Sequence, residues 1–296
     1  MRTKLAVLSV GERPHQVNGR AVRELTEADY DSVLALLSED PLGGIHLRSM
    51  IEDHGLCHHS HRGRFFGYYE GGRLAGVALL GHAILIYAGS SALGHFAQAA
   101  ADSQATGHVI FGPRTQVETF WEHFSRHGRE TKLVREHYWY VCRQPRLMPS
   151  GLPLRQATLA ALDVVADAHA EMAYEESGTD PRVSDSEGFR RRVAERIERG
   201  RVWVKLEGGR VVFKADLASE TSDAVYLEGV WTHPDYRKRG IAQSCLSELV
   251  CRLARQQKVI CLAAEPHEQT ALRVYERVGF VRCEDYQARF LKPLQK

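Results

Sequence analysis

The chain has 296 residues, of which 44% are hydrophobic and 26% charged, and its formal net charge is +2 at pH 7. This length allows two ordinary globular domains, and the nearly balanced charge gives no electrostatic case for nucleic-acid binding. No apolar run approaches the roughly 20 residues that a membrane-spanning helix needs, and the short run 5–10 lacks the features of a signal peptide. We therefore expect neither a nucleic-acid partner nor a membrane partner.

The six cysteines are scattered without a C-x-x-C pair, and four of them stand in apolar strand or helix patterns. This usage predicts reduced, buried thiols rather than a disulfide framework or a zinc site. We therefore expect a cytoplasmic location and no bound metal.

Residues 1–20 show little periodicity and are interpreted as an N-terminal lead-in. After residue 20 the spacing of the apolar residues predicts a strand, two helices and a hairpin of two strands, because apolar residues recur with a period of two in a strand and of 3.6 in a helix. Thr26 is a suitable N-cap for the first helix, and the Glu-Gly-Gly-Arg sequence at 70–73 suits the hairpin turn. The strands are expected at 21–25, 64–69 and 74–80, and the second helix at 45–53.

The same pattern recurs from residue 153 onward. Residues 153–158 repeat the strand and cap of residues 22–26, and a second Glu-Gly-Gly-Arg turn begins at Glu207, 137 residues after Glu70. Later elements also correspond: buried strands at 108–111 and 258–263, glycine-ended helices, and closing strands at 133–142 and 281–291. Internal duplication of one α+β unit explains these matches.

Prolines and glycine cluster between residues 144 and 151, which places the boundary between the copies there. The predicted domains are a lead-in at 1–20, a first copy at 21–148 and a second copy at 149–296. The expected fold class is α+β in α/β/α layers, with two tandem units whose mixed, mostly antiparallel sheets are flanked by helices.

The stretch Val225–Ala242 carries the most specific signal. A buried strand breaks at His233-Pro234, because proline cannot continue a ladder, and three basic residues then lead to Gly240 and an amphipathic helix. The first N–H groups of a helix lack partners inside it, the helix dipole adds positive charge, and glycine allows close approach. The pattern therefore predicts a phosphate site at a helix N-terminus.

The chain has neither a Walker run nor a G-x-G-x-x-G fingerprint. It has R-x-x-G-x-A after a strand of the form L-E-x-V-x-x-x-P-x-Y, which resembles the acyl-CoA motif of the GNAT superfamily of N-acyltransferases. The resemblance is strong over 153–292 and mainly architectural over 21–143. It implies acetyl-CoA as cofactor, with its pyrophosphate held by Arg237, Lys238, Arg239, Gly240, Ile241 and Ala242. A surface basic turn before an ordinary helix is the other interpretation.

The first copy lacks this chemistry. Its corresponding loop, around 84–94, has glycine and serine but no arginine or lysine, and Phe124 stands where the second copy has Tyr275. We infer a degenerate first copy and a catalytic second copy. The alternative is that the first copy binds coenzyme A through backbone amides alone.

Acyl transfer to an amine needs a held thioester, a neutral amine, a site for the oxyanion and a proton for the thiolate. The resemblance implies that the pantetheine arm of the cofactor lies along Val230, Trp231 and Thr232, with the N–H of Val230 or Trp231 facing the thioester oxygen. It also implies that Tyr275, in A-x-x-x-Y-E-x-x-G-F, protonates the thiolate, because tyrosine has an ordinary pKa of about 10. Packing of Tyr275 in the core is the alternative.

Glu228 is the candidate base, and the period of two on a strand predicts that it points the same way as Val230. A half-buried carboxylate paired to an arginine is the alternative for Glu228. Glu268 departs from the family, which usually has asparagine there, and this leaves open how the cofactor's arm is held.

The acceptor is expected to be an amine of a small molecule, a peptide or a protein, and the oligomeric state is open. Carboxylates after the first helix of the second copy could attract a cationic amine, although a solvated helix face also explains them; they are Glu171, Glu175, Glu176 and Asp180. The prediction is acetyl transfer from acetyl-CoA to a primary amine. The alternatives are a non-catalytic acyl-CoA sensor or scaffold and a mycothiol-synthase-like tandem acetyltransferase.

Two further clusters are interpreted as structural. The histidine-rich run 54–61, which includes Cys57, matches no standard zinc spacing and is expected on a solvent-facing loop. The arginines at 190–192 belong to a helix expected at 189–199 and predict a solvated face, not a nucleic-acid patch.

Overall fold

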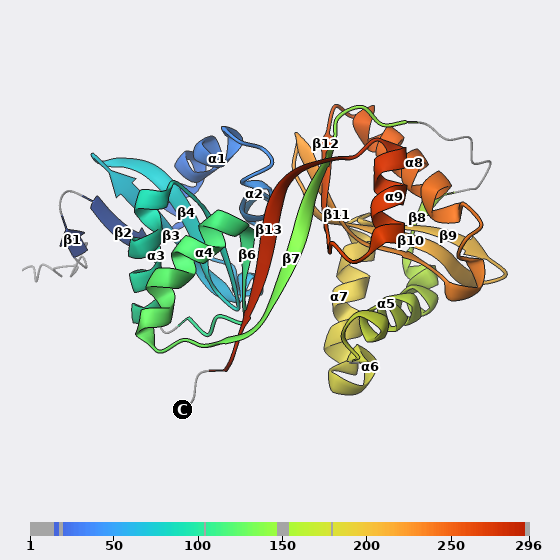
Figure 1. Cartoon of the computed structure of the whole chain (residues 1–296), viewed down its shortest axis with the longest axis horizontal. Coiled ribbons are helices and arrows are strands. Elements are labelled where there is room, and N and C mark those ends of the chain that lie inside the picture. The colour runs from blue at the N-terminus through green and yellow to red at the C-terminus, as the bar shows by residue number, and fades with distance from the viewer. Residues whose placement is uncertain (1–14, 18–19, 104, 147–153, 179, 294–296) are drawn as a thin grey trace, which may run out of the picture.

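A computed structural model describes residues 15–17, 20–103, 105–146, 154–178 and 180–293 (Figure 1). Its strands and helices alternate along the chain in two similar series, one in each half. The first series comprises β1 His15–Val17, β2 Arg20–Glu24, η1 Glu27–Asp29, α1 Tyr30–Ser38, α2 Ile45–His54, η2 His59–His61, β3 Gly63–Glu70, β4 Arg73–Gly81, β5 Ala83–Ala88, α3 Ser90–Asp102, β6 Val109–Pro113, α4 Arg114–Phe124, η3 Ser125–His127 and β7 Thr131–Cys142.

The second series follows the same order of main elements, without a counterpart of β1 and with the additional short helix α6. It comprises β8 Arg155–Gln156, η4 Leu159–Ala161, α5 Leu162–Ser177, α6 Pro181–Ser184, α7 Ser186–Glu198, β9 Val202–Glu207, β10 Arg210–Glu220, β11 Ala224–Thr232, η5 Pro234–Tyr236, α8 Ile241–Ala254, β12 Val259–Ala264, α9 Gln269–Val278 and β13 Val281–Leu291.

Local signals in the sequence place most of these elements. The two Glu-Gly-Gly-Arg turns adopt the same left-handed geometry, with φ of +57° and +80° at Gly71 and Gly72 and of +56° and +78° at Gly208 and Gly209. Only glycine adopts such φ values without strain, so the repeated turn is both a sequence feature and a structural one. The strands on either side of both turns are confirmed.

Short elements escaped the sequence patterns. Residues 15–17, within the predicted lead-in, form β1 and pair antiparallel with β2, and residues 181–184 form the one-turn helix α6. Three or four residues are too few to show a period of two or of 3.6. Residues 1–14 and 18–19 of the lead-in and residues 147–151 of the expected boundary lie outside the described part of the chain.

All the described strands join one 13-stranded sheet, in the order β1-β2-β3-β4-β5-β6-β13-β7-β12-β11-β10-β9-β8. Most neighbours are antiparallel, whereas β5 with β6 and β11 with β12 are parallel. In the first half, α3 and α4 cover one face and α1 and α2 the other. In the second half, α8 and α9 cover one face and α5 and α7 the other. The predicted α+β class with α/β/α layers is confirmed.

The closing strands are exchanged between the halves. β13, from the second half, pairs with β6 of the first half, and β7, from the first half, pairs with β12 of the second half. β7 and β13 also pair with each other, antiparallel along nearly their whole lengths, and Figure 1 shows them side by side across the centre of the molecule. The division into 21–148 and 149–296 remains a prediction, and the sheet itself runs across it without interruption.

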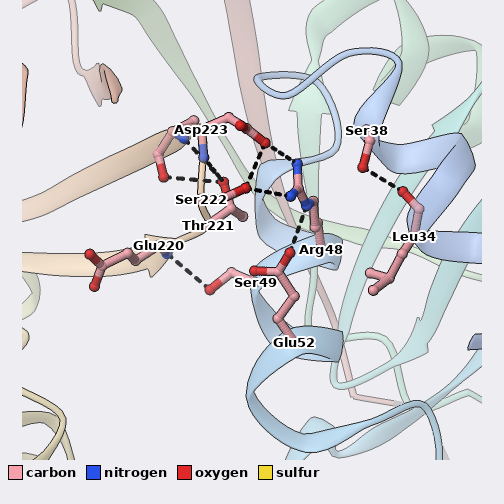
Figure 2. Close-up of polar contacts among 10 residues, drawn as sticks. Leu34, Ser38, Arg48, Ser49, Glu52, Glu220, Thr221, Ser222 and Asp223 are labelled. Atoms are coloured by element: carbon pink, nitrogen blue, oxygen red, sulfur yellow. Dashed lines mark hydrogen bonds and ion pairs between the residues drawn. The ribbon is translucent and has the colours of Figure 1, made fainter. Parts of the chain in front are cut away.

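Helix α2 of the first half also docks on the second half (Figure 2). The buried Arg48 guanidinium lies 2.7 Å from the Glu52 carboxylate and 2.5 Å from that of Asp223, in the turn before β11. The hydroxyl of Ser49 accepts the backbone N–H of Glu220 at 3.0 Å. Because Arg48 is buried and doubly paired, this contact fixes α2 against the β10–β11 hairpin.

The burial of the thiols only partly follows the expectation. All six cysteines are free; Cys142, Cys245 and Cys261 are buried, whereas Cys57 and Cys283 are exposed. Among the described residues, no helix has the length and apolar character needed to cross a membrane.

The exchanged strands predict that neither half folds alone. A fragment of residues 1–148 leaves β7 without β12 and β13, and a fragment of residues 149–296 leaves β12 and β13 without β7. Unpaired strands of this length expose backbone groups and apolar faces, so each fragment should aggregate or lack a cooperative unfolding transition. Size-exclusion chromatography and urea unfolding followed by circular dichroism measure this.

The matched control is the full chain with a protease site inserted after residue 149. Cleavage there keeps both halves present, so the nicked protein should elute as one particle and unfold in one transition. A monomeric, cooperatively unfolding fragment would contradict the requirement for exchanged strands.

Candidate active site

The predicted phosphate strand, β11, separates from its parallel neighbour before it ends. Residues Ala224–Leu227 of β11 pair with Val259–Leu262 of β12, and no described residue of β12 pairs with β11 beyond Leu227. The end of β12 pairs instead with β7, where Ala264 lies opposite Tyr138. The sheet therefore opens between the ends of β11 and β12, with the second half of β11 along one side of the opening.

A bulge interrupts β11 at this opening. Gly229 has a φ of +58°, and the register passes from Glu228 opposite Asp216 to Trp231 opposite Lys214. Two residues of β11, Gly229 and Val230, thus face a single residue of β10, as in a β-bulge, and neither has a register partner in β10 or in the described β12.

The bulge overturns the expectation that Glu228 and Val230 point the same way. Val230 packs against the core under α8 and α9, whereas Glu228 pairs with Arg196 of α7 on the opposite face. The extra residue shifts the alternation of side chains by one position, which the simple period of two does not anticipate.

The loop after β11 presents an open helix end. Gly240 is the N-cap of α8 with a φ of +76°, Lys238 has a φ of +62°, and a methyl group built on Gly240 would meet nothing within 4 Å. Lys238 and Arg239 are exposed, and the Arg239 guanidinium lies 5.3 Å from the centre of the Tyr236 ring. The first N–H groups of α8, beginning with Ile241 and Ala242, therefore stand beside two exposed cations at an unobstructed surface.

Arg237, the third cation of the loop, is already engaged. Its Nη2 lies 3.0 and 2.7 Å from the two carboxylate oxygens of Glu175, and its Nε donates to the carbonyl of Thr232 at 3.0 Å. The indole Nε1 of Trp231 also donates to Glu175, at 3.3 Å. One carboxylate of α5 thus ties the loop to the end of β11, a link that the sequence did not indicate.

Tyr275 lies on α9 and is 7% exposed. Its ring centre is 6.3 Å from that of Tyr140 and 6.0 Å from that of Phe280, within the core cluster under α8 and α9. Glu276, the next residue, accepts the hydroxyl of Tyr140 at 3.3 Å. The surroundings of Tyr275 are those of the packing alternative, and its role as proton donor stays a prediction.

Glu228 is half exposed and paired. Its carboxylate lies 3.2 Å from Nη1 of Arg196, and this carboxylate contributes most to the raised pKa of Arg196. Such a pair is the arrangement expected in the alternative reading of Glu228, so its role as base also stays a prediction.

A buried charge cluster lies directly behind Glu228, on the face covered by α5 and α7. Lys214 and Asp216 of β10 are 0% and 1% exposed and lie 2.9 Å apart, and Nε2 of the buried His169 is 3.5 Å from Asp216. Burial, together with the charges of Lys214 and Arg196, lowers the pKa of His169 to about 2. His169 is therefore neutral in the folded protein at any ordinary pH.

Glu268 is the N-cap of α9 and is exposed. Desolvation and the neighbouring Glu265 carboxylate raise its pKa, and Glu265 itself pairs with Arg135 of β7 at 3.0 Å. The departure from the family thus adds an acidic group at the head of α9, beside the opening of the sheet.

The corresponding place in the first half is acidic. A cavity of about 620 Å³ adjoins the Gly89 N-cap of α3, and its lining includes three carboxylates, Glu39, Asp40 and Glu284, against one cation, Arg143. Phe124, at the position of Tyr275, is 1% exposed and packs on Phe120. Carboxylates repel phosphate, so the geometry agrees with a first copy that has lost the anion site.

The two remaining clusters, the run 54–61 and the arginines at 190–192, make contacts within the fold. In the part of the chain that the structure describes, no three His, Cys, Asp or Glu side chains could hold a metal ion together. His61 is buried and contacts the Gly55 carbonyl at 2.8 Å, so the expectation that the whole run 54–61 faces solvent is wrong for His61. The arginines at 190–192 are exposed, and Arg190 and Arg192 pair with Asp163 and Asp185.

Sequence comparison identifies the second half. The profile of the Acetyltransferase (GNAT) family matches residues 168–280, which contain the opening of the sheet, the bulge and the open helix end. Residues 168–280 of this chain are a GNAT-family domain. A domain of unknown function (DUF4081) matches residues 63–166, and a comparison with curated proteins found no match.

Solved structures share the whole arrangement at low identity. A GCN5-related N-acetyltransferase from Sphaerobacter thermophilus is 17% identical with a TM-score of 0.59, over 95% of this chain and 97% of that one. A GNAT-family acetyltransferase from Colwellia psychrerythraea is 14% identical with a TM-score of 0.57, over 91% and 99%. A tandem GNAT protein from the clavulanic acid biosynthesis pathway is 13% identical with a TM-score of 0.55, over 94% and 99%. The chain therefore has a tandem GNAT fold.

The residues that sequence reasoning missed in this GNAT domain are those of the charge cluster. Lys214 and Asp216 alternate with apolar residues in the run V-V-F-K-A-D-L, and this alternation resembles a strand with one solvated face. Only the covering helices α5 and α7 turn that face into an interior. Two opposite charges two residues apart in a largely apolar strand were the available signal.

The neutral His169 predicts a specific loss of stability in acid. Its pKa is about 2 when folded and about 6.5 when unfolded, so the unfolded state takes up a proton below pH 6.5 that the folded state does not. Between pH 7.5 and 5.5 this lowers the free energy of unfolding by about 1.4 kcal/mol. Urea unfolding of wild type and His169→Gln at both pH values tests it: the variant should lose correspondingly less stability over this range. Equal losses in the two proteins would contradict a buried, neutral His169.

Proposed function

We propose that this protein is an acyl-CoA-dependent N-acyltransferase that moves acetyl from acetyl-CoA to a primary amine in its second copy. The observation that carries the proposal is the open N-terminus of α8, with Lys238 and Arg239 beside it, at the end of a strand that has separated from its neighbour. A diphosphate fits the cations and helix amides, and an extended chain fits the unpaired edge of β11.

In this proposal the residues of the chain hold and polarise the thioester. Lys238, Arg239 and the first amides of α8 bind the pyrophosphate, and the edge of β11 from Val230 to Thr232 aligns the arm. Acetyl-CoA supplies the activated acyl group: the amine forms a C–N bond at its carbonyl carbon and the C–S bond breaks. Tyr275 donates a proton to the departing thiolate, and Glu228 accepts a proton from the amine directly or through water.

The acceptor is proposed as a primary amine of a small molecule, a peptide or a protein. Two of the four carboxylates of the acidic segment are already neutralised, because Glu175 pairs with Arg237 and Asp180 pairs with Arg182. These two pairs weaken the interpretation of the acidic segment as a surface that attracts a cationic amine.

A second candidate is an acyl-CoA-binding sensor or scaffold without turnover. The packing of Tyr275 among Tyr140 and Phe280 and the pairing of Glu228 with Arg196 favour it, because both residues have structural partners. Thiol release on incubation with acetyl-CoA and a broad panel of amines separates the candidates: release above the buffer rate supports the enzyme. A mycothiol-synthase-like acceptor is one arm of that panel.

Calorimetry tests the anion site. We expect acetyl-CoA to bind the wild-type protein, and the double variant Lys238→Gln/Arg239→Gln to bind about 100-fold or more weakly, because each charge-assisted bond contributes about 1.5–3 kcal/mol. Arg73→Gln is the matched control, since Arg73 is an exposed arginine beside the glycine turn of the first copy. Absence of acetyl-CoA binding to the wild type would refute the proposed function.

Tyrosine replacement tests the chemical step. Tyr275→Phe should lower turnover by about 100-fold while the acetyl-CoA dissociation constant stays within about twofold, because the hydroxyl acts only on the departing thiolate. Tyr140→Phe is the control, as Tyr140 packs against Tyr275 and its hydroxyl binds Glu276 instead. Unchanged turnover in Tyr275→Phe would exclude Tyr275 as the proton donor.

A further inference from the structure

The cluster behind the bulge contains a fully buried ion pair that the proposed chemistry has not used. Lys214 is 0% exposed and Asp216 1%, and the Lys214 Nζ also contacts Gly229 and Met172. A buried pair of charges loses its hydration and is often no more stable than apolar residues of similar size. Stability alone therefore does not explain this pair, and its contacts suggest another role for it.

Lys214 holds the bulge. Its Nζ donates to the Gly229 carbonyl at 2.9 Å and to the Asp216 carboxylate at 2.9 Å. A Cβ at Gly229 would lie 2.7 Å from this Nζ and 2.6 Å from the Asp216 carboxylate. The glycine is thus required both by its φ of +58° and by the charged pair pressed against it.

The contact acts on one peptide unit. The carbonyl of Gly229 and the N–H of Val230 belong to the same planar amide, so an ammonium bound at the oxygen fixes the direction of the N–H. It also draws electrons toward the oxygen and strengthens the N–H as a hydrogen-bond donor, since linked hydrogen bonds polarise one another in a low-dielectric interior.

The register separates the two candidate donors. Trp231 has a register partner in β10, Lys214 itself, whereas Val230 has none in β10 or the described β12. The amide that the ammonium polarises is therefore also the one without a register partner, in the part of β11 beyond its pairing with β12.

We propose that Lys214 is a positioning residue: its amino group, anchored by Asp216, aims and polarises the Gly229–Val230 amide so that the Val230 N–H binds the thioester oxygen. Negative charge collects on that oxygen as the amine attacks, and a preset donor stabilises it. This rests on the proposed function and deepens it by selecting Val230 over Trp231 and assigning a role to a pair remote from the solvent.

The test reads the thioester carbonyl itself and needs no acceptor. Difference infrared spectra of bound acetyl-CoA, labelled with ¹³C at the acetyl carbonyl, report the hydrogen bond as a fall in the C=O stretching frequency relative to free acetyl-CoA. The variant Lys214→Met/Asp216→Asn removes both charges together, so neither is left buried alone. We expect it to lose most of the frequency shift while its acetyl-CoA dissociation constant stays within about threefold, because the pyrophosphate site is elsewhere.

The control is Met172→Leu, which removes the other contact of the Lys214 Nζ, at 3.7 Å, and leaves the bond to Gly229. It should keep the full shift. If the double variant does not fold, Gly229→Ala is measured in its place. Its methyl group disturbs the contact between Lys214 and Gly229 while both charges are retained, so this variant should also lose the frequency shift.

The outcomes separate the two proposals. No binding of acetyl-CoA to the wild type overturns the proposed function. If acetyl-CoA binds and the frequency shift survives in Lys214→Met/Asp216→Asn, the role of Lys214 is overturned and the proposed function stands. The same holds for a surviving shift in Gly229→Ala, where that variant replaces the double variant. A shift lost in the variant and kept in Met172→Leu, at unchanged affinity, supports it.

Discussion

The antiparallel pairing of β7 with β13 is the constraint on which the rest of the molecule depends. Each strand ends one half of the chain and completes the sheet of the other half, so the two copies share one hydrogen-bonded ladder. The exchange also reaches the cores, since Tyr140 and Cys142 of β7 pack under α8 and α9, and Leu291 of β13 packs under α3 and α4. The GNAT domain therefore has no complete core without the first copy.

Duplication has preserved the backbone and changed the chemistry. Both copies have the same glycine turn, a parallel pair of strands and a helix that follows the first strand of that pair. The second copy presents cations at that helix, whereas the first presents carboxylates around a cavity. The first copy instead supplies β7 and the docked helix α2, whose Arg48 reaches Asp223 beside β11. Its sequence is thus under structural demands that do not require an anion site.

The face of the sheet under α5 and α7 concentrates charge in an interior. Lys214, Asp216 and Arg196 lie within one connected group, with Glu228 at its solvent side, and positive and negative groups alternate along it. Such a group costs desolvation energy and is tolerated because each charge has an opposite neighbour at short range. Its position behind the bulge links the stability of the domain to the geometry of a single amide.

The sequence by itself determined most of the elements, the repeated pattern and the GNAT resemblance, because glycine turns, proline breaks and apolar periods are local signals, and its phosphate loop stays a prediction. Tertiary structure alone decided three things. The exchange of β7 and β13 depends on pairing between strands about 150 residues apart, which no local pattern encodes. The opposite directions of Glu228 and Val230 follow from one extra residue in a ladder. The burial of Lys214 and Asp216 depends on helices that come from elsewhere in the chain to cover that face.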